Sequence, residues 1–163
     1  MSYRRKSWQE KLADDKGHPT VFEISAKQSK RWGAGTCVIP SPAEVNELMR
    51  RVPKGKLTTI DELRKALARR HRATIACPIT TGIFSWIAAQ AAAEAEAEGK
   101  KRTTCYWRTL KSSGEINPKY PGGVLLLKKK LAAEGHRILK KGKRYFVEGF
   151  EKSLARIEGS TSK

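Results

Sequence analysis

The chain has few of the residues that build metal sites and disulfide frameworks. Its 163 residues include three cysteines, Cys37, Cys77 and Cys105, whose wide spacing fits neither a disulfide framework nor a paired CxxC metal site. The three histidines are equally scattered, so a zinc site would need ligands that the sequence does not bring together. We therefore expect reduced thiols, no metal and no other cofactor.

Long apolar runs are also missing. No hydrophobic stretch approaches the ~20 residues that span a bilayer. The charged start MSYRRKSWQEK lacks the apolar core of a signal peptide. These absences predict a protein without a membrane partner, located in the cytoplasm and associated with the nucleoid.

Acidic residues are outnumbered by basic ones. The 34 Lys and Arg against 16 Asp and Glu give a formal net charge of +18. The positive electrostatic field of such a charge attracts polyanions, which makes nucleic acid the leading partner and an acidic membrane surface the alternative. Hydrophobic residues make up 39% of the chain, enough apolar surface for one core. We expect one compact domain and a monomer.

The clearest helix signals lie in the middle of the chain. A helix is predicted over 41–52, where a serine N-cap precedes a proline at the first helical position. A second is predicted over 58–71, where Thr59 and Glu62 have the spacing of a capping box. A third is predicted over 78–98, which is rich in alanine and glutamate. The last two helices, joined by a short turn, suggest a helix-turn-helix.

The first 40 residues are less regular. Residues 7–13 predict a short polar helix. The runs TVFEI and GTCVIP have the composition of strands, and the basic stretch AKQSKRWGAG separates them. Residues 1–40 are therefore interpreted as an N-terminal extension.

Beyond the third helix the pattern changes to short strands and one more helix. YWRTL, residues 106–110, has strand composition, and 112–123 is a loop rich in turn residues. A helix is predicted over 124–135, closed by a glycine. HRIL and RYFVEGF flank the turn KKGK and predict a hairpin that would form a wing. The tail 158–163 is expected to fray.

Four motifs follow one another in a distinctive order: VPKGKLTTIDEL, CPITTGIF, YWRTLKSSGEINPKYPGG and AAEGHRI. In this register, residues from about 42 to 139 resemble the DNA-binding domain of the O6-alkylguanine-DNA alkyltransferase family, including its non-enzymatic alkyltransferase-like members. The resemblance implies a mainly α fold with small β elements, a winged helix-turn-helix-like domain over 41–150. The extension over 1–40 precedes it, and a helix end and tail over 151–163 follow.

The active-site motif departs from that of the enzymes. Their cysteine and histidine correspond to Tyr106 and Trp107, whereas Arg108 and Glu134 are retained. A phenol with a pKa of ~10 is a poor nucleophile unless a base lies beside it, and an indole is no base. The resemblance therefore implies a non-enzymatic protein that recognises alkylated or distorted bases, such as O6-alkylguanine, in DNA repair. The implied lesion pocket comprises Tyr106, Trp107, Arg108, Tyr120, Pro121, Gly122, Gly123 and Glu134.

The resemblance also implies contacts to the minor groove of double-stranded DNA, which is alkylated in the favoured form. The family's arginine at the start of the recognition helix corresponds to Ile79, and an apolar wedge can still enter between base steps. Basic clusters would supply phosphate contacts with little sequence preference. The implied DNA-contacting residues of the two helices are Thr59, Ile60, Pro78, Ile79, Thr80, Thr81, Gly82 and Ser85. The candidate phosphate contacts are Lys54, Lys56, Arg69, Arg70, Arg72, residues 100–102, Lys140, Lys141, Lys143 and Arg144.

Three alternatives stay open. The first is an active alkyltransferase that uses Cys105 or Cys77, although alternation along a strand would turn Cys105 away from the pocket. The second is a base-removing enzyme that uses an acid such as Asp61 or Glu134. The third is a general winged-helix DNA-binding regulator. For the leading interpretation we also expect a repair-protein partner, whose identity the sequence does not give.

Overall fold

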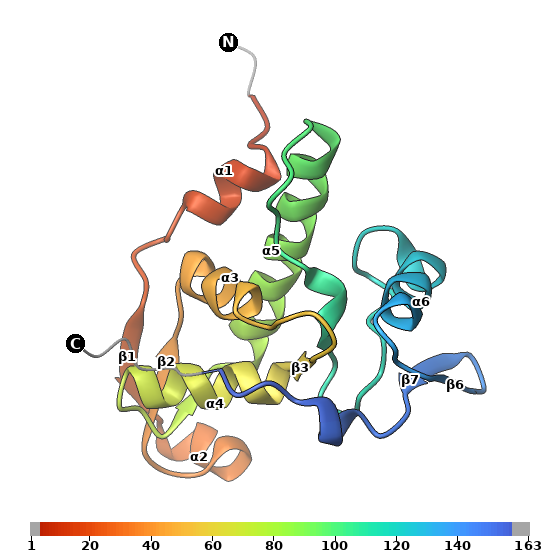
Figure 1. Ribbon diagram of the computed structural model, residues 1–163. Coiled ribbons are helices and arrows are strands. Elements are labelled where there is room, and N and C mark those ends of the chain that lie inside the picture. Colours follow the sequence, from red (N-terminus) through yellow and green to blue (C-terminus); the bar gives the residue numbers. More distant parts are fainter. Residues whose placement is uncertain (1–3, 158–163) are drawn as a thin grey trace.

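The computed structural model describes residues 4–157, and the tail 158–163 that was expected to fray lies outside them. One long helix stands at the centre, with shorter helices and small sheets around it (Figure 1). In chain order the elements are α1 (Trp8–Ala13), β1 (Thr20–Glu23), α2 (Ala26–Trp32), β2 (Thr36–Ile39), α3 (Pro42–Arg50), β3 (Thr58–Thr59), α4 (Ile60–Arg70), β4 (Ile75–Ala76), α5 (Pro78–Ala97), η1 (Tyr106–Arg108), β5 (Thr109–Leu110), α6 (Gly123–Ala133), β6 (Ile138–Lys141), β7 (Arg144–Val147) and η2 (Phe150–Ser153).

The three central helices begin where the sequence predicts. Ser41 Oγ accepts the Glu44 N–H at 3.3 Å, and the Glu44 carboxylate accepts the Ser41 N–H at 2.9 Å, which completes a capping box at the start of α3. Thr59 Oγ1 accepts the Glu62 N–H at 3.2 Å at the start of α4. α5 begins at Pro78, as predicted. These caps satisfy backbone donors that the helices themselves leave unbonded.

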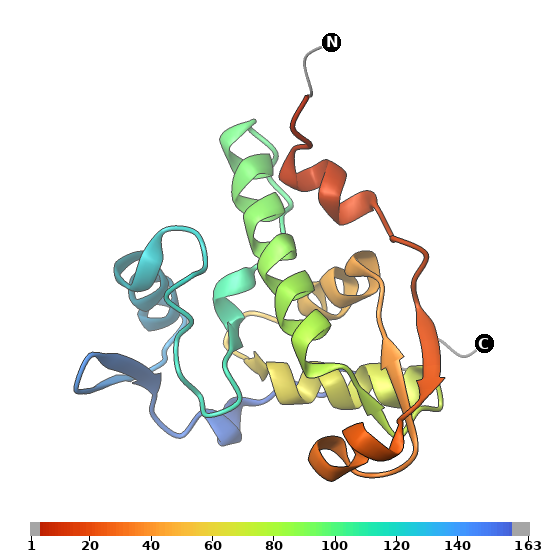
Figure 2. The same cartoon turned by 180° about the vertical axis from the view of Figure 1, so that it is seen from behind.

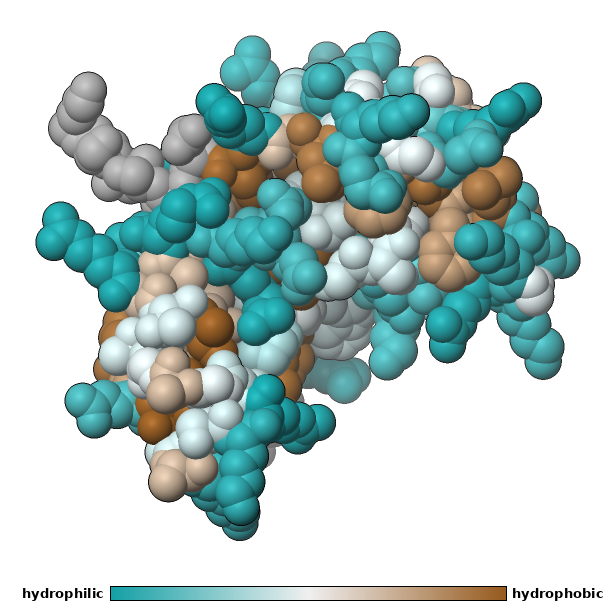
Figure 3. Space-filling view, turned by 90° about the horizontal axis from the view of Figure 1, so that it is seen from below, coloured by the Kyte–Doolittle hydropathy of each residue, from teal (hydrophilic) through white to brown (hydrophobic). Residues whose placement is uncertain are grey.

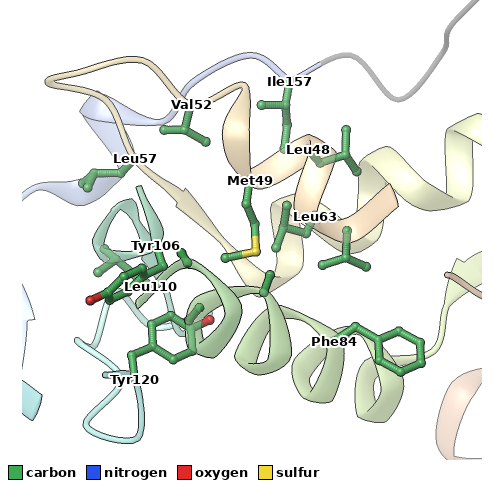
Figure 4. Packing of buried hydrophobic residues seen from close by; sticks show 14 of the residues in the cluster. Leu48, Met49, Val52, Leu57, Leu63, Phe84, Tyr106, Leu110, Tyr120 and Ile157 are labelled. Atoms are coloured by element: carbon green, nitrogen blue, oxygen red, sulfur yellow. The ribbon is translucent and has the colours of Figure 1, made fainter. Parts of the chain in front are cut away.

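The long helix α5 forms the axis of the core. It buries Phe84, Ile87 and a run of alanines whose small side chains let α1 and α3 lie close against it. Leu48 and Met49 of α3 and Leu63 of α4 are fully buried in the same cluster (Figure 4). Removing apolar surface from water stabilises such a core by about 25 cal/mol per Å². The shared core therefore holds α3, α4 and α5 in one fixed arrangement.

A three-stranded sheet connects the N-terminal extension to the helix-turn-helix. β1 pairs antiparallel with β2, and β2 pairs parallel with β4, where Cys37 lies opposite Ile75 and Val38 opposite Ala76. The chain passes from β4 through Cys77 into α5. The predicted extension over 1–40 thus shares a sheet with the strand that precedes α5.

The hairpin near the C-terminus has the predicted form. β6 and β7 pair antiparallel, starting with Ile138 opposite Val147. Gly142 in the turn has φ +64°, a conformation that glycine adopts without strain. A bridge between Glu115 and Phe146 joins the hairpin to the preceding loop. The hairpin is therefore fixed against the loop over 112–123.

Two segments differ from the prediction. The expected strand over 106–110 is wrong for its first part, because Tyr106–Arg108 is a 3-10 turn and only Thr109–Leu110 pairs with β3. The cause is local, since the Arg108 N–H donates to Cys105 O at 3.2 Å instead of to a neighbouring strand. Alternation along a strand therefore does not set the direction of the Cys105 side chain. The basic stretch before β2 contains the helix α2, which the sequence interpretation missed.

The surface is mainly hydrophilic. Seen from below, charged and polar side chains surround smaller apolar patches (Figure 3). Within residues 4–157, no helix combines the length and the apolar composition needed to cross a membrane. The exposed large apolar side chains there are Leu125 (81% exposed), Ile79 (61%), Ile83 (46%) and Val21 (45%). Two of these four lie on the first turns of α5.

Candidate nucleic-acid interface

A buried ion pair joins the end of α6 to the 3-10 turn η1. The Glu134 carboxylate accepts hydrogen bonds from Arg108 Nε at 3.0 Å and Nη2 at 2.8 Å, from Trp107 Nε1 at 3.0 Å and from the Gly55 N–H at 3.3 Å. Arg108 Nη1 donates to Val52 O at 2.8 Å. The two charged side chains are only 11% and 6% exposed. The retained arginine and glutamate therefore tie three chain segments together.

The electrostatics of this pair favour a permanent carboxylate. Burial alone would raise the pKa of Glu134, but hydrogen bonds from Arg108, Trp107 and the Gly55 N–H hold it below its usual value. Burial likewise opposes the charge of Arg108, yet the bond to Glu134 leaves the pKa of the guanidinium above its ordinary value. A carboxylate with a lowered pKa is a weak proton acceptor. The pair is suited to holding structure rather than to relaying a proton.

Tyr106, which the resemblance matches to the enzymes' reactive cysteine, is buried. It is 2% exposed, and its ring meets Trp107 and Tyr120 edge-on, with ring centroids 5.7 and 6.2 Å away (Figure 4). Its hydroxyl donates to Pro121 O at 3.4 Å, a long and weak bond. Burial raises the pKa of Tyr106 and raises that of Tyr120 to about 12. Both phenols are therefore neutral at physiological pH.

The thiols of Cys105 and Cys37 are free but not activated. Burial raises the pKa of Cys105, and the charged groups that act on its thiol are Arg108, Glu134, Lys130 and Glu96, with no histidine among them. Burial also raises the pKa of Cys37, to about 11. Within the described chain, no three His, Cys, Asp or Glu side chains gather as metal ligands do.

An open groove lies beside the predicted pocket, between the first turns of α5 and the loop before α6. Its volume is about 420 Å³. Trp86 Nε1 donates to Lys119 O at 3.2 Å and joins the two walls. Gly82 leaves the floor open, since a Cβ there would meet nothing within 4 Å. The lining residues are Ile79, Gly82, Ile83 and Trp86 of α5 and Asn117 and Lys119 of the loop.

Only part of the predicted set of α5 residues faces this groove. Ile79 and Gly82 line it, whereas Thr81 and Ser85 are buried and bond inward, Thr81 Oγ1 to Cys77 O at 2.7 Å and Ser85 Oγ to Gly82 O at 2.8 Å. Thr80 is half-buried. A role for these three hydroxyls on DNA stays a prediction. The sequence interpretation missed Ile83, Trp86, Asn117 and Lys119 as lining residues, although Ile83 follows Ile79 at helical spacing.

Most residues of the predicted lesion pocket lie close together, but their side chains pack against one another. Tyr106, Trp107, Arg108, Glu134, Tyr120 and Pro121 contact one another through the bonds and ring contacts above. Gly122 and Gly123 begin α6, and a Cβ on Gly122, whose φ is +89°, would meet Leu126 Cδ2 at 2.2 Å. These glycines serve the turn into α6. Whether the cluster opens to admit a base stays a prediction.

The predicted phosphate contacts divide into exposed and structural cations. Lys54, Lys56, Arg69 and Arg72 are exposed, as a phosphate contact requires. Arg70, by contrast, is only 10% exposed and pairs with Glu44 and Glu47. At the start of α4, Thr59, which caps the helix, is buried, and Ile60 is half-buried. Arg70 is therefore better explained as a brace between α3 and α4.

Taken together, the helix pair α4 and α5, the hairpin β6–β7 and the buried pair of Arg108 and Glu134 define a winged helix-turn-helix of the alkyltransferase-like type. A solved structure of S. pombe ATL in complex with DNA has this fold: it is 16% identical, with a TM-score of 0.51 over 71% of this chain and 94% of that one. A structure of S. pombe Atl1 with damaged DNA containing O6-carboxymethylguanine matches over the same shares at 16% identity, with a TM-score of 0.49. No protein-family model matches the chain, and no curated protein matches it. The mainly α, alkyltransferase-like fold predicted from the four motifs is thereby confirmed.

Proposed function

We propose that this protein is a non-enzymatic DNA-binding protein that recognises alkylated or distorted bases, such as O6-alkylguanine, from the minor groove. The observation that carries the proposal is the open groove beside α5. Exposed Ile79 and Ile83 lie at its rim, in a chain with a net charge of +18. The S. pombe protein that shares the fold is bound to DNA in its solved structure, which supports the same partner here.

The composition of the groove suits a base with an added alkyl group. Its volume of about 420 Å³ falls within the ~300–1,000 Å³ of small-ligand pockets, which are mostly apolar with a few polar groups. Ile79, Ile83 and Trp86 offer apolar and aromatic surface, while Asn117 supplies an amide that can bond a base edge. An exposed isoleucine on the first turn of α5 can act as the wedge that unstacks a base step.

The chemistry around Tyr106 supports a binding rather than a transfer function. A thiolate or an activated hydroxyl is needed to attack an alkyl carbon. Tyr106 is neutral and buried, the pKa of the neighbouring Cys105 thiol is raised, and Glu134 is already occupied by Arg108. Because binding alone repairs nothing, the proposal includes a repair protein that acts at the bound site. It also includes action as a monomer in the cytoplasm, on the nucleoid.

Binding to matched duplexes tests the proposal. We expect tighter binding to a duplex with O6-methylguanine than to the same duplex with guanine, at several salt concentrations, since phosphate contacts alone respond to salt equally on both. Equal affinity for the two duplexes would contradict lesion recognition and would be consistent with general DNA binding alone.

Intact mass after incubation with the modified duplex tests the non-enzymatic part. We expect an unchanged protein mass and an unchanged oligonucleotide. A stoichiometric gain of one alkyl group on a cysteine would overturn the proposal in favour of an alkyltransferase, and a released base would do so in favour of a base-removing enzyme.

A further inference from the structure

The connection between β1 and β2 carries an unopposed positive charge. Its residues, 24–35, include Lys27, Lys30 and Arg31 and no acidic residue. All three cations are exposed on α2, a helix that buries none of its side chains. Among residues 4–157, no ion pair involves any of the three. Core packing therefore gives no reason for these side chains.

The helix α2 is nevertheless held in a defined place. Ser25 and Gln28 form a full capping box at its start, and Gly33 ends it with φ +81°. The Ile24 N–H donates to Gly35 O at 2.9 Å and closes the base of the connection. A preorganised helix presents its charges to a ligand at a lower entropic cost than a flexible loop.

The sheet connects α2 to the strand that leads into α5. Strand β2, which follows α2, pairs with β4, and β4 leads into α5. The Thr36 N–H donates to Thr74 Oγ1 at 3.0 Å, next to the turn that carries exposed Arg72. Viewed from behind, α2 projects below the N-terminal end of α5 (Figure 2). α2 therefore lies beyond the N-terminal end of α5, and Ile79 near that end lines the groove.

We propose that α2 is a second DNA-contacting element, which binds the phosphate backbone of the same duplex on one flank of the recognised base. The inference rests on the proposed function, because the groove fixes where the duplex lies. Contact by α2 lengthens the bound site on that flank alone and adds affinity without sequence preference.

The test compares two triple variants of the full chain. K27Q/K30Q/R31Q removes the α2 cations, and K129Q/K152Q/R156Q removes the same charge from exposed positions outside α2. All six sites are exposed, so both variants should keep the wild-type melting temperature. Charge-retaining K27R/K30R/R31K is the rescue control.

The readout is affinity for lesion-containing duplexes in which either flank is shortened one base pair at a time, at about 50 to 200 mM salt. We expect the wild type to need a longer duplex on one flank than on the other, and the α2 variant to lose this asymmetry. The slope of log affinity against log salt is negative, and its magnitude should be smaller by about 2 to 3 in the α2 variant, roughly 0.9 for each lost phosphate contact. The control and rescue variants should keep the asymmetry.

The outcomes separate this inference from the proposed function. Unchanged asymmetry and salt slope in the α2 variant would overturn the role of α2, even if lesion discrimination is found. A shallower salt dependence of the α2 variant on duplexes that the wild type does not discriminate would support the contact by α2 and contradict lesion recognition. No binding of the wild type to any duplex would overturn both.

Discussion

The Tyr120 hydroxyl donates to Ser85 Oγ at 3.0 Å and joins the loop before α6 to the helix α5. Both residues are almost completely buried, and the Ser85 hydroxyl donates its own hydrogen bond to Gly82 O. Gly82 lines the groove on α5, and the opposite wall is the loop that carries Tyr120. This pair therefore sets the separation of the two walls.

Replacement of the two partners should not have additive effects on stability. Ser85→Ala leaves the Tyr120 hydroxyl buried without its acceptor, which should cost about 1–3 kcal/mol of unfolding free energy. Tyr120→Phe removes the group that needs a partner, so it should cost about 1 kcal/mol or less, and the double variant should match it. Urea unfolding of the three variants measures the coupling. Additive losses in the double variant would show that the two hydroxyls act independently.

The elements predicted correctly from the sequence depend on short-range signals. Ser41 with Glu44, and Thr59 with Glu62, cap their helices across three residues, and the turn around Gly142 closes its hairpin locally. The helix α2 has the same kind of signal, a serine followed three residues later by glutamine.

The groove could not be predicted from short-range signals. It depends on where the loop over 112–123 folds against α5, and the bond from Trp86 to Lys119 O spans 33 residues. No periodicity in either segment encodes that meeting. The same holds for Tyr106: the motif gave its position in the chain, but its burial is decided by Tyr120 and Trp107 from separate segments. The motif residues predicted the cluster around Tyr106, whereas the open groove depends on long-range packing that the motifs do not encode.

Two adjacent threonines should respond in opposite ways to replacement by valine. The Thr58 hydroxyl is fully buried and has no hydrogen-bond partner among residues 4–157, whereas Thr59 Oγ1 caps α4. Thr58→Val removes a desolvated polar group from a strand and should raise the unfolding free energy by up to about 1 kcal/mol. Thr59→Val removes a cap and should lower it by about 1 kcal/mol. Thermal unfolding followed by circular dichroism compares them, and an equal loss in both variants would contradict the assignment.

Glu134→Gln should weaken the fold and make it less sensitive to acid. Removing one charge of a buried pair leaves Arg108 uncompensated, which should cost about 3 kcal/mol at pH 7. Because the folded-state pKa of Glu134 is lowered, the stability that its carboxylate contributes is present above its ordinary pKa of 4.5 and is lost as the pH falls through the folded-state value.

The measurement is unfolding free energy as a function of pH for both proteins. The difference between wild type and E134Q should be largest near neutrality and should shrink below about pH 4.5. Burial lowers the pKa of His136 and the charge of Glu134 opposes that shift, so both proteins should also carry H136Q, which removes this titration from the difference. A difference that stays constant down to strongly acidic pH would show that the loss comes from packing and not from the charge.

Ile79→Ala should weaken DNA binding without weakening the fold. Ile79 is 61% exposed at the rim of the groove, so truncation should change stability by about 0.5 kcal/mol or less. Its loss as a wedge should cost about 1–2 kcal/mol of binding, roughly five- to thirtyfold in affinity. Leu125→Ala is the matched control, because Leu125 is 81% exposed but does not line the groove. Fluorescence anisotropy with the O6-methylguanine duplex should show the loss for I79A alone; equal losses for both variants would mean that exposed apolar area, and not the groove, holds the DNA.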